Sequence, residues 1–126
     1  MTVVDHGVSV QVVSVLLVEA TPVIRDGIRF VLADEPDVRL VAETVSAREA
    51  VQLAATLRPD VVVADLPDLP LLCRRIRTYC TAVLAFTDEQ DDRTVMSAIR
   101  AGVRGYLPKT STPEDLVRAI RSVAAG

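Results

Sequence analysis

Short apolar runs alternate with amphipathic stretches along most of this chain. The runs at Val12–Val18, Val61–Ala64 and Ala82–Phe86 contain almost only apolar residues. This pattern is typical of strands that are buried on both faces of a parallel sheet. Two further strands are predicted at Val38–Thr44 and Gly105–Leu107, the second of them short.

Capping residues predict where three of the intervening helices begin. Thr21 fits a helix N-cap, with Pro22 at the first helical position. Ser46–Glu49 has the capping-box pattern and opens a helix that continues to about Leu57. Thr112–Asp115 caps the last helix in a similar way. The apolar face of this last helix consists of Leu116, Ile120 and Val123.

Two more helices are predicted from the spacing of apolar residues alone. The first is short, and its apolar positions are Leu69, Leu72, Ile76 and Tyr79. The second runs from about Asp92 to Ala101, and we expect Val95 and Ile99 to point inward. Gly102 follows as the stop signal, because glycine readily adopts the left-handed conformation that closes a helix.

These elements form five strand–helix units in about 115 residues. Such alternation is typical of a parallel sheet with helices on both faces. Right-handed crossovers leave few topologies, and we expect the doubly wound five-stranded order 2-1-3-4-5 within one α/β domain at residues 12–126. Residues 1–11 are interpreted as an N-terminal extension without an assigned element.

Four polar residues follow the apolar strands and should meet at one edge of this sheet. They are Glu19, Asp65, Thr87 and Lys109. In doubly wound sheets ligands bind beyond the carboxyl ends of the strands, near the point where the strand order reverses. Two carboxylates, a hydroxyl and an ammonium suit phosphoryl transfer, in which a carboxylate can attack and the other groups neutralise the phosphoryl oxygens.

Composition limits the other functions of this chain. The net charge is −3 and the isoelectric point is about 5.1, which does not favour nucleic-acid binding by this domain itself. The chain has thirteen arginines and one lysine, Lys109, so a compact ammonium is used only there. Cys73 and Cys80 lack a metal-binding spacing, and we expect reduced thiols in a cytoplasmic protein. No signal peptide or membrane span is expected.

The chain resembles the receiver domain of two-component response regulators, especially the NarL/FixJ (LuxR-type) class, which has a flavodoxin-like fold. The matching segments are VLLVEATPVIRDGIRFVL, LRPDVVVADLP, VLAFT and AIRAGVRGYLPKTSTPEDLVRAIRSVAAG. The resemblance covers about Val12 to Gly126. Its most specific part is AGVRGYLPK, in which strand, aromatic residue and lysine follow the family's order and spacing.

The resemblance implies a role for each residue of the pocket. Asp65 matches the aspartate that accepts a phosphoryl group from a histidine kinase, and Lys109 matches the lysine that binds this group. Thr87 matches the hydroxyl residue that turns toward the phosphoryl group. Tyr106 matches the aromatic switch residue, although it could equally be an aromatic residue at the edge of the core.

The implied metal site departs from the family pattern. Glu19, Asp65 and the backbone carbonyl of Pro67 match the Mg²⁺ ligands, but Ala20 stands where a second acidic residue is usual. Since Mg²⁺ dehydrates reluctantly and needs well-placed oxygens, we expect weak or absent Mg²⁺ binding. A salt bridge between Glu19 and Lys109 that fills the site is an equal alternative.

Two further departures lie in the loops. The segment that begins at Asp65, DLPDLPLLCRRIR, is about four residues shorter than is usual in the family, so the third helix could start late. Asp68 could act as a substitute metal ligand, but we expect it to face solvent. Asp88 stands beside Thr87, where a small residue is usual, and its charge would repel a phosphoryl dianion.

We therefore expect an atypical receiver domain of a bacterial transcription regulator, with weakened or absent phosphorylation, that is not an enzyme. The alternative is a conventional receiver that is phosphorylated on Asp65 by a histidine kinase. A homodimer is expected, although the sequence does not define which face forms it. In a second hypothesis the domain is an interaction module that uses the apolar edges of the last two helices and the fifth strand, and a small molecule or partner protein replaces phosphate as the signal. DNA binding is expected only through a C-terminal helix-turn-helix domain that this chain lacks.

A flavin-binding domain would need a glycine-rich loop after the first strand, and an aspartate phosphatase would need a DxDx[TV] motif; the chain has neither.

Overall fold

The computed structural model describes residues 2–4, 8–65, 67–79, 82–88 and 91–126. Its main sheet is parallel and has the order β4-β3-β5-β6-β7. The strands of this sheet are β3 (Val13–Glu19), β4 (Val38–Thr44), β5 (Val61–Asp65), β6 (Ala82–Phe86) and β7 (Gly105–Leu107). In chain order this is the predicted 2-1-3-4-5 arrangement, so the fold prediction is confirmed.

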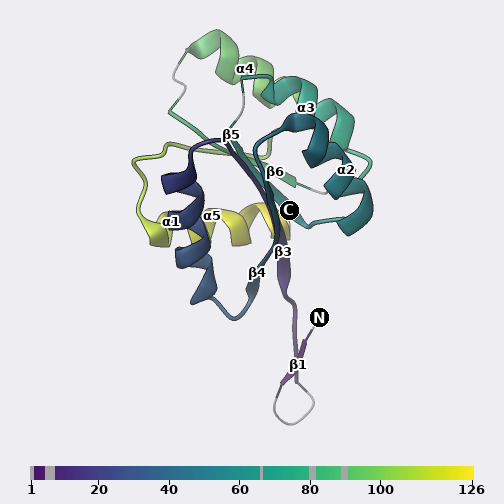
Figure 1. The fold of residues 1–126 in the computed structure, drawn as a ribbon, viewed down its shortest axis with the longest axis vertical. Helices are drawn as coiled ribbons and strands as arrows, with labels where there is room; N and C mark the ends of the chain where they lie inside the picture. The colour runs from purple at the N-terminus through teal and green to yellow at the C-terminus, as the bar shows by residue number, and fades with distance from the viewer. Residues whose placement is uncertain (1, 5–7, 66, 80–81, 89–90) are drawn as a thin grey trace.

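In the described part of the chain, five helices cover the two faces of this sheet (Figure 1). They are α1 (Pro22–Ala33), α2 (Ala47–Leu57), α3 (Leu69–Ile76), α4 (Asp92–Ala101) and α5 (Pro113–Ala125). Helices α1 and α5 pack on one face, and α2, α3 and α4 pack on the other. Alternate residues of the central strands therefore enter two separate cores: Leu17 and Val63 face α1 and α5, whereas Leu16 and Val62 face the other three helices.

The predicted helix ends are found where the sequence places them. The Ser46 hydroxyl accepts a hydrogen bond from the Glu49 N–H at 2.9 Å, and Thr112 and Asp115 form a reciprocal capping box. Gly102 closes α4 with φ +113°. Thr21 is the N-cap of α1, but its side chain makes no capping hydrogen bond there.

Two details of the helix predictions are wrong. The sequence predicts that Ile99 points inward, but this residue is 48% exposed; the buried residue of α4 is Ala98. Helix α4 lies against α3, and Ala98 is the residue that it contributes to the core shared with α3. Tyr79 lies beyond the end of α3 at Ile76, although it still packs against the same core, with the Arg58 guanidinium 5.1 Å from the centre of its ring.

The N-terminal segment contains structure that the sequence pattern did not predict. Strands β1 (Thr2–Val4) and β2 (Val8–Val10) form a separate two-stranded antiparallel sheet. Figure 1 shows that this pair lies beyond the amino end of β3, away from the main sheet. Cys73 is buried in α3, whereas Cys80 lies outside the described residues. Within the described part of the chain, no helix is both long and apolar enough to cross a membrane.

Candidate functional site

The predicted pocket residues stand at the carboxyl ends of neighbouring strands. Glu19 ends β3 and Asp65 ends β5, and the two are direct partners in the parallel register. Thr87 follows β6, and Lys109 follows β7 after Pro108. The sheet order brings these four residues to the edge where the strand order reverses, as the sequence predicts.

Lys109 bridges the two carboxylates. Its Nζ atom lies 2.7 Å from Glu19 Oε1, and it also forms an ion pair with Asp65 Oδ2. The Glu19 side chain is 3% exposed, that of Lys109 is 14% exposed and that of Asp65 is 28% exposed. Glu19 is therefore a buried anion whose charge is compensated by Lys109, and Asp65 is the carboxylate that remains accessible.

The environment of Lys109 favours its charged form. Burial alone would lower the pKa of this ammonium, but the hydrogen bonds and charges of Asp65 and Glu19 outweigh burial. The pKa of Lys109 is consequently raised above its ordinary value. A permanent positive charge thus lies between the two acidic groups, in the region where a metal cation would need to bind.

The turn after β3 orients Glu19 toward Lys109. Glu19 Oε2 accepts a hydrogen bond from the Thr21 backbone N–H at 3.0 Å. Arg25 Nη1 donates to the carbonyl oxygens of Glu19 at 2.9 Å and Ala20 at 3.3 Å. Sequence reasoning missed Arg25 because nothing in a single sequence distinguishes an arginine one turn into a helix from an ordinary surface residue.

The segment after β6 is bonded to the end of β7 and to Lys109 next to the pocket. The Thr87 N–H donates to the Leu107 carbonyl at 3.0 Å, and Asp88 Oδ1 accepts a hydrogen bond from the Lys109 N–H at 3.1 Å. Thr87 is buried and Asp88 is exposed. The sequence predicts that the carboxylate of Asp88 lies near the pocket. In the structure this carboxylate also accepts a hydrogen bond from the backbone of Lys109.

A cavity of about 390 Å³ opens beside these groups. Its described lining consists of Glu19, Ala20, Thr21, Asp65, Pro67, Leu69, Pro70, Thr87, Thr94, Ala98 and Tyr106. Tyr106 is half-buried at the α4 side of this cavity, so the predicted switch residue and the predicted acceptor share one space. Asp68 is exposed at the N-cap of α3 and is not among these lining residues.

The described residues offer few acidic side chains for a divalent cation. Among the described residues, no group of three or more His, Cys, Asp or Glu side chains is arranged to hold a metal ion. Two carboxylates are present, Glu19 and Asp65, and both are in contact with Lys109. Ala20 borders the cavity but contributes no side-chain oxygen. The residues present therefore fit a buried lysine ammonium better than a hexacoordinate Mg²⁺.

Comparisons with known proteins agree on one family. The family model for the response regulator receiver domain matches residues 15–121. The chain is 29% identical to the nitrate/nitrite response regulator protein NarL of Escherichia coli (strain K12), over 120 residues that make up 90% of this chain and 55% of NarL. It is 34% identical to the DNA-binding transcriptional activator DevR/DosR of Mycobacterium tuberculosis, again covering 90% of this chain and 55% of that protein. The chain thus spans about half the length of these relatives.

Solved structures of receiver domains superpose closely on this chain. A two-component response regulator of the LuxR family from Aurantimonas sp. SI85-9A1 has a TM-score of 0.82 at 33% identity, with 92% of this chain and 87% of that chain covered. The signal receiver domain of the putative response regulator NarL from Mycobacterium tuberculosis has a TM-score of 0.84 at 25% identity, with coverage of 92% and 98%.

Proposed function

This chain belongs to the response regulator receiver domain family, and we propose that it is an atypical signal-receiving domain of a bacterial transcription regulator. In this proposal Lys109 is the resident cation of the acidic pocket, and Mg²⁺-dependent phosphorylation of Asp65 is weak or absent. The observation that carries the proposal is the Lys109 ammonium in contact with both Glu19 and Asp65, next to Ala20.

Electrostatics support a weak metal site. Glu19, Asp65 and the Pro67 carbonyl are the groups that would hold Mg²⁺, and a bound Mg²⁺ would help to neutralise the oxygens of the transferred phosphoryl group. Two unit charges about 4 Å apart interact with an energy of about 4 kcal/mol when the effective dielectric constant is about 20. The Lys109 ammonium and the missing carboxylate at Ala20 both act against a divalent cation, so their effects add.

A conventional phospho-acceptor is the second candidate function. It is favoured by Asp65, which remains partly exposed and opens onto the cavity, and by Thr87 and Lys109 beside it. In this reaction an Asp65 carboxylate oxygen forms a bond to phosphorus while the phosphorus–nitrogen bond of a kinase phosphohistidine breaks. The imidazole leaves with the bonding electron pair and takes up a proton, and Thr87 and Lys109 bind the transferred oxygens.

The signal would act by shifting an equilibrium between two arrangements of the domain. In the conventional case Thr87 moves toward the phosphoryl group and Tyr106 follows it into the shared cavity. In the atypical case a small molecule, a partner protein or the protein concentration biases the same equilibrium. We propose that the output is a change of homodimerisation, and that the domain itself is not an enzyme.

The remaining parts of the proposal concern the parent protein. Relatives such as DevR/DosR are DNA-binding transcription regulators about twice as long as the matched region. We infer that DNA binding belongs to a further domain, that a histidine kinase is a partner only if Asp65 is phosphorylated, and that the protein works in the cytoplasm.

Intact-protein mass spectrometry with acetyl phosphate tests the two candidates. We expect little or no phosphoryl adduct on the wild-type protein, with Mg²⁺ or with EDTA. The variant Ala20→Asp should gain an adduct that requires Mg²⁺, and Ala20→Asp combined with Asp65→Asn should lose it. A stoichiometric, Mg²⁺-dependent adduct on the wild-type protein that Asp65→Asn removes would instead establish the conventional receiver.

A second measurement separates a phosphate switch from an interaction module. The oligomeric state is compared with and without Mg²⁺ and beryllofluoride, an analogue of the phosphoryl group. The atypical proposal predicts no change in the wild-type protein. A shift in the dimer fraction that Asp65→Asn abolishes would contradict it.

A further inference from the structure

Asp88 joins two loops that flank the pocket. Its Oδ1 atom accepts a hydrogen bond from the Lys109 N–H at 3.1 Å, and the neighbouring Thr87 N–H donates to the Leu107 carbonyl at 3.0 Å. The first bond is made by a side chain and the second by the backbone. Thr87 is therefore bonded to the last residue of β7 through the backbone, whereas the bond to Lys109 depends on which side chain stands at position 88.

The residue that Asp88 holds is the one that contacts the acceptor. The backbone of Lys109 is bonded to Asp88, while its ammonium is bonded to Asp65 and Glu19. A shift of the loop after β6 toward Asp65 would break the Asp88 bond or move Lys109 with it. We propose that Asp88 is a positioning residue that holds these loops in the observed arrangement and slows phosphoryl transfer to Asp65.

Two physical effects act in the same direction. The hydrogen bond to the Lys109 amide stabilises the arrangement in which Thr87 is paired with Leu107. The negative charge of Asp88, one residue from Thr87, repels an incoming phosphoryl dianion. Because Asp88 is exposed, solvent and salt weaken both effects, and we expect a change in rate of about threefold to tenfold.

This inference rests on the proposed function, because it takes Asp65 as the phosphoryl acceptor. It is tested in the Ala20→Asp background, where the cation site is restored and adduct formation gives a measurable rate. Asp88→Asn keeps an oxygen that can accept the Lys109 hydrogen bond but removes the charge, and Asp88→Ala removes both. Asp34→Asn is the matched control, since it removes one exposed carboxylate at the C-cap of α1.

The rate of adduct formation with acetyl phosphate is measured at low and high salt. We expect Asp88→Asn to be faster than its parent mainly at low salt, Asp88→Ala to be faster at both, and Asp34→Asn to be unchanged. Hydrogen exchange of the Lys109 amide should accelerate in Asp88→Ala and stay slow in Asp88→Asn. This exchange reports the bond without any phosphorylation.

The outcomes separate this inference from the proposed function. Equal rates and equal amide exchange in the Asp88 variants and their parent would overturn the role of Asp88 while leaving the proposed function intact. Absence of an adduct from every variant would also overturn the role of Asp88, because Asp88 can slow phosphoryl transfer only if Asp65 accepts the phosphoryl group. An efficient adduct on the wild-type protein would contradict only the atypical receiver, and the Asp88 variants would still be compared in that background.

Discussion

At the scale of single residues, the charge of Lys109 decides what else the pocket can bind. Its ammonium neutralises Glu19, whose side chain is almost completely buried, and it also occupies Asp65. An ionised carboxylate without a partner would be strongly unfavourable at this depth. Any divalent cation must therefore replace the contribution of Lys109 to the stability of the fold as well as bind its own ligands.

This competition predicts the behaviour of Lys109→Met. Removal of the ammonium leaves two adjacent carboxylates uncompensated, and we expect the free energy of unfolding to fall by about 1–3 kcal/mol in EDTA. Mg²⁺ should then raise the melting temperature of the variant by several degrees, because binding to the folded state alone stabilises it. Thermal unfolding with and without Mg²⁺ measures both effects.

The control for this prediction is Arg104→Met, which removes an exposed cation near β7. Its melting temperature should change little and should not respond to Mg²⁺. If Mg²⁺ stabilises the wild-type protein as much as Lys109→Met, the ammonium and the metal do not compete, and the interpretation of Lys109 as the resident cation is wrong.

At the scale of elements, replacing glycine by alanine should have opposite effects on stability at two positions. A Cβ atom at Gly105 in β7 would lie 2.8 Å from Val123 Cγ1 and 2.9 Å from Leu84 Cδ1. One at Gly27 in α1 would have no neighbour within 4 Å. Gly105→Ala should therefore destabilise the domain by about 1–3 kcal/mol, whereas Gly27→Ala should stabilise it by about 0.5–1 kcal/mol through helix propensity. Urea unfolding compares them, and a stable Gly105→Ala variant would show that α5 can move away from β7.

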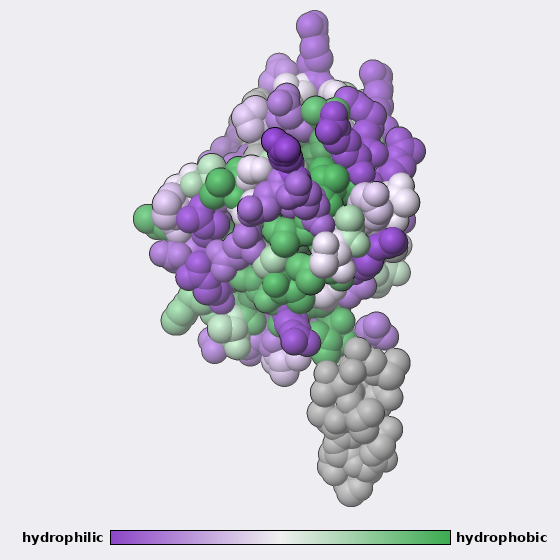
Figure 2. All heavy atoms as spheres, turned by 45° about the vertical axis from the view of Figure 1, so that its right-hand side comes forward, coloured by the Kyte–Doolittle hydropathy of each residue, from purple (hydrophilic) through white to green (hydrophobic). Residues whose placement is uncertain are grey.

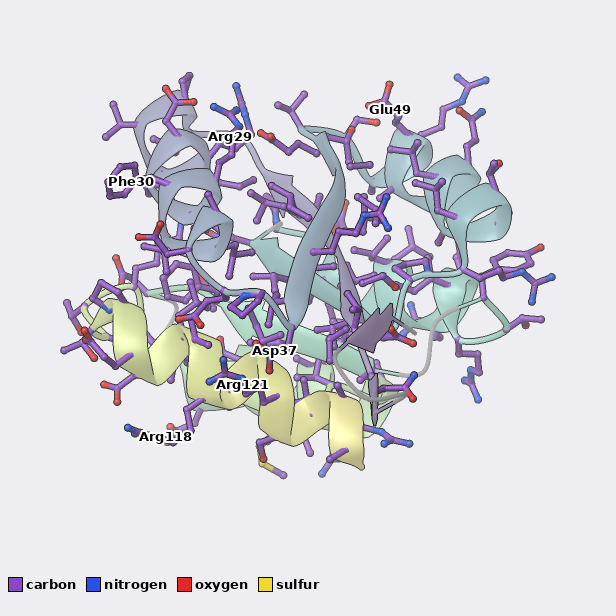
Figure 3. The ribbon with its side chains drawn as sticks, turned by 90° about the horizontal axis from the view of Figure 1, so that it is seen from below. Arg29, Phe30, Asp37, Glu49, Arg118 and Arg121 are labelled. Carbon is purple, nitrogen blue, oxygen red and sulfur yellow. The ribbon has the colours of Figure 1, made fainter. Side chains whose placement is uncertain are left out.

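An ion pair between α5 and the segment before β4 predicts a dependence of stability on pH. Arg121 donates from Nε and Nη2 to the two carboxylate oxygens of Asp37, each at 2.8 Å, and Figure 3 shows Arg121 on α5 with Asp37 beside it. The hydrogen bond from Arg121 outweighs burial and lowers the pKa of Asp37. A carboxylate whose folded-state pKa is lowered contributes stability above its unfolded value of about 3.9. This contribution is lost as the pH falls through the folded-state pKa.

Asp37→Asn should therefore lower the melting temperature by about 1–4 °C at neutral pH and have no effect at strongly acidic pH. Asp34→Asn serves as the control, because that carboxylate is exposed in the same region of the chain. The two variants are compared by thermal unfolding between neutral and acidic pH. A difference between Asp37→Asn and the wild-type protein that persists at the lowest pH would mean that the side chain acts through packing rather than charge.

Some elements of the fold could be predicted from the sequence more completely than others. The strands and capped helices were predictable because each carries local information: a continuous apolar run for β5 and β6, and capping residues for α2 and α5. The exposure of Ile99 was not predictable, since it depends on how α4 lies against α3. In the site, strand ends predicted the convergence of Glu19, Asp65 and Lys109, but the bonds made by Arg25 and Asp88 depend on loop geometry.

At the scale of the whole molecule, apolar side chains remain exposed in separate places. Figure 2 shows hydrophobic surface along the middle of one face, with hydrophilic side chains on either side. Among the described residues, large exposed apolar side chains include Met96 and Ile99 on α4 and Val23 and Phe30 on α1. These pairs lie on helices that cover opposite faces of the sheet, so they predict two different dimers.

We expect the homodimer to form on the α4 side. Met96 and Ile99 are one turn apart and are each about half exposed, and Arg93 and Arg100 lie exposed on the same helix. The buried side of the same helix, at Ala98, lines the acidic cavity together with Tyr106, so a change in the pocket can move α4 and with it the exposed face. An apolar centre with a charged rim is typical of a protein–protein interface.

Sedimentation velocity over a series of protein concentrations tests this expectation. Ile99→Asp places a charge in the centre of the α4 face and should weaken dimerisation by about tenfold to a hundredfold. Phe30→Asp, an equally drastic change on a more exposed residue of α1, should leave the dimerisation constant unchanged. Circular dichroism of both variants checks that they remain folded. If Phe30→Asp produces the monomer instead, the interface lies on the α1 side, where it could not report on Tyr106 directly. If the wild-type protein is monomeric at every concentration, dimerisation is not its output, and the pocket must act on a different partner.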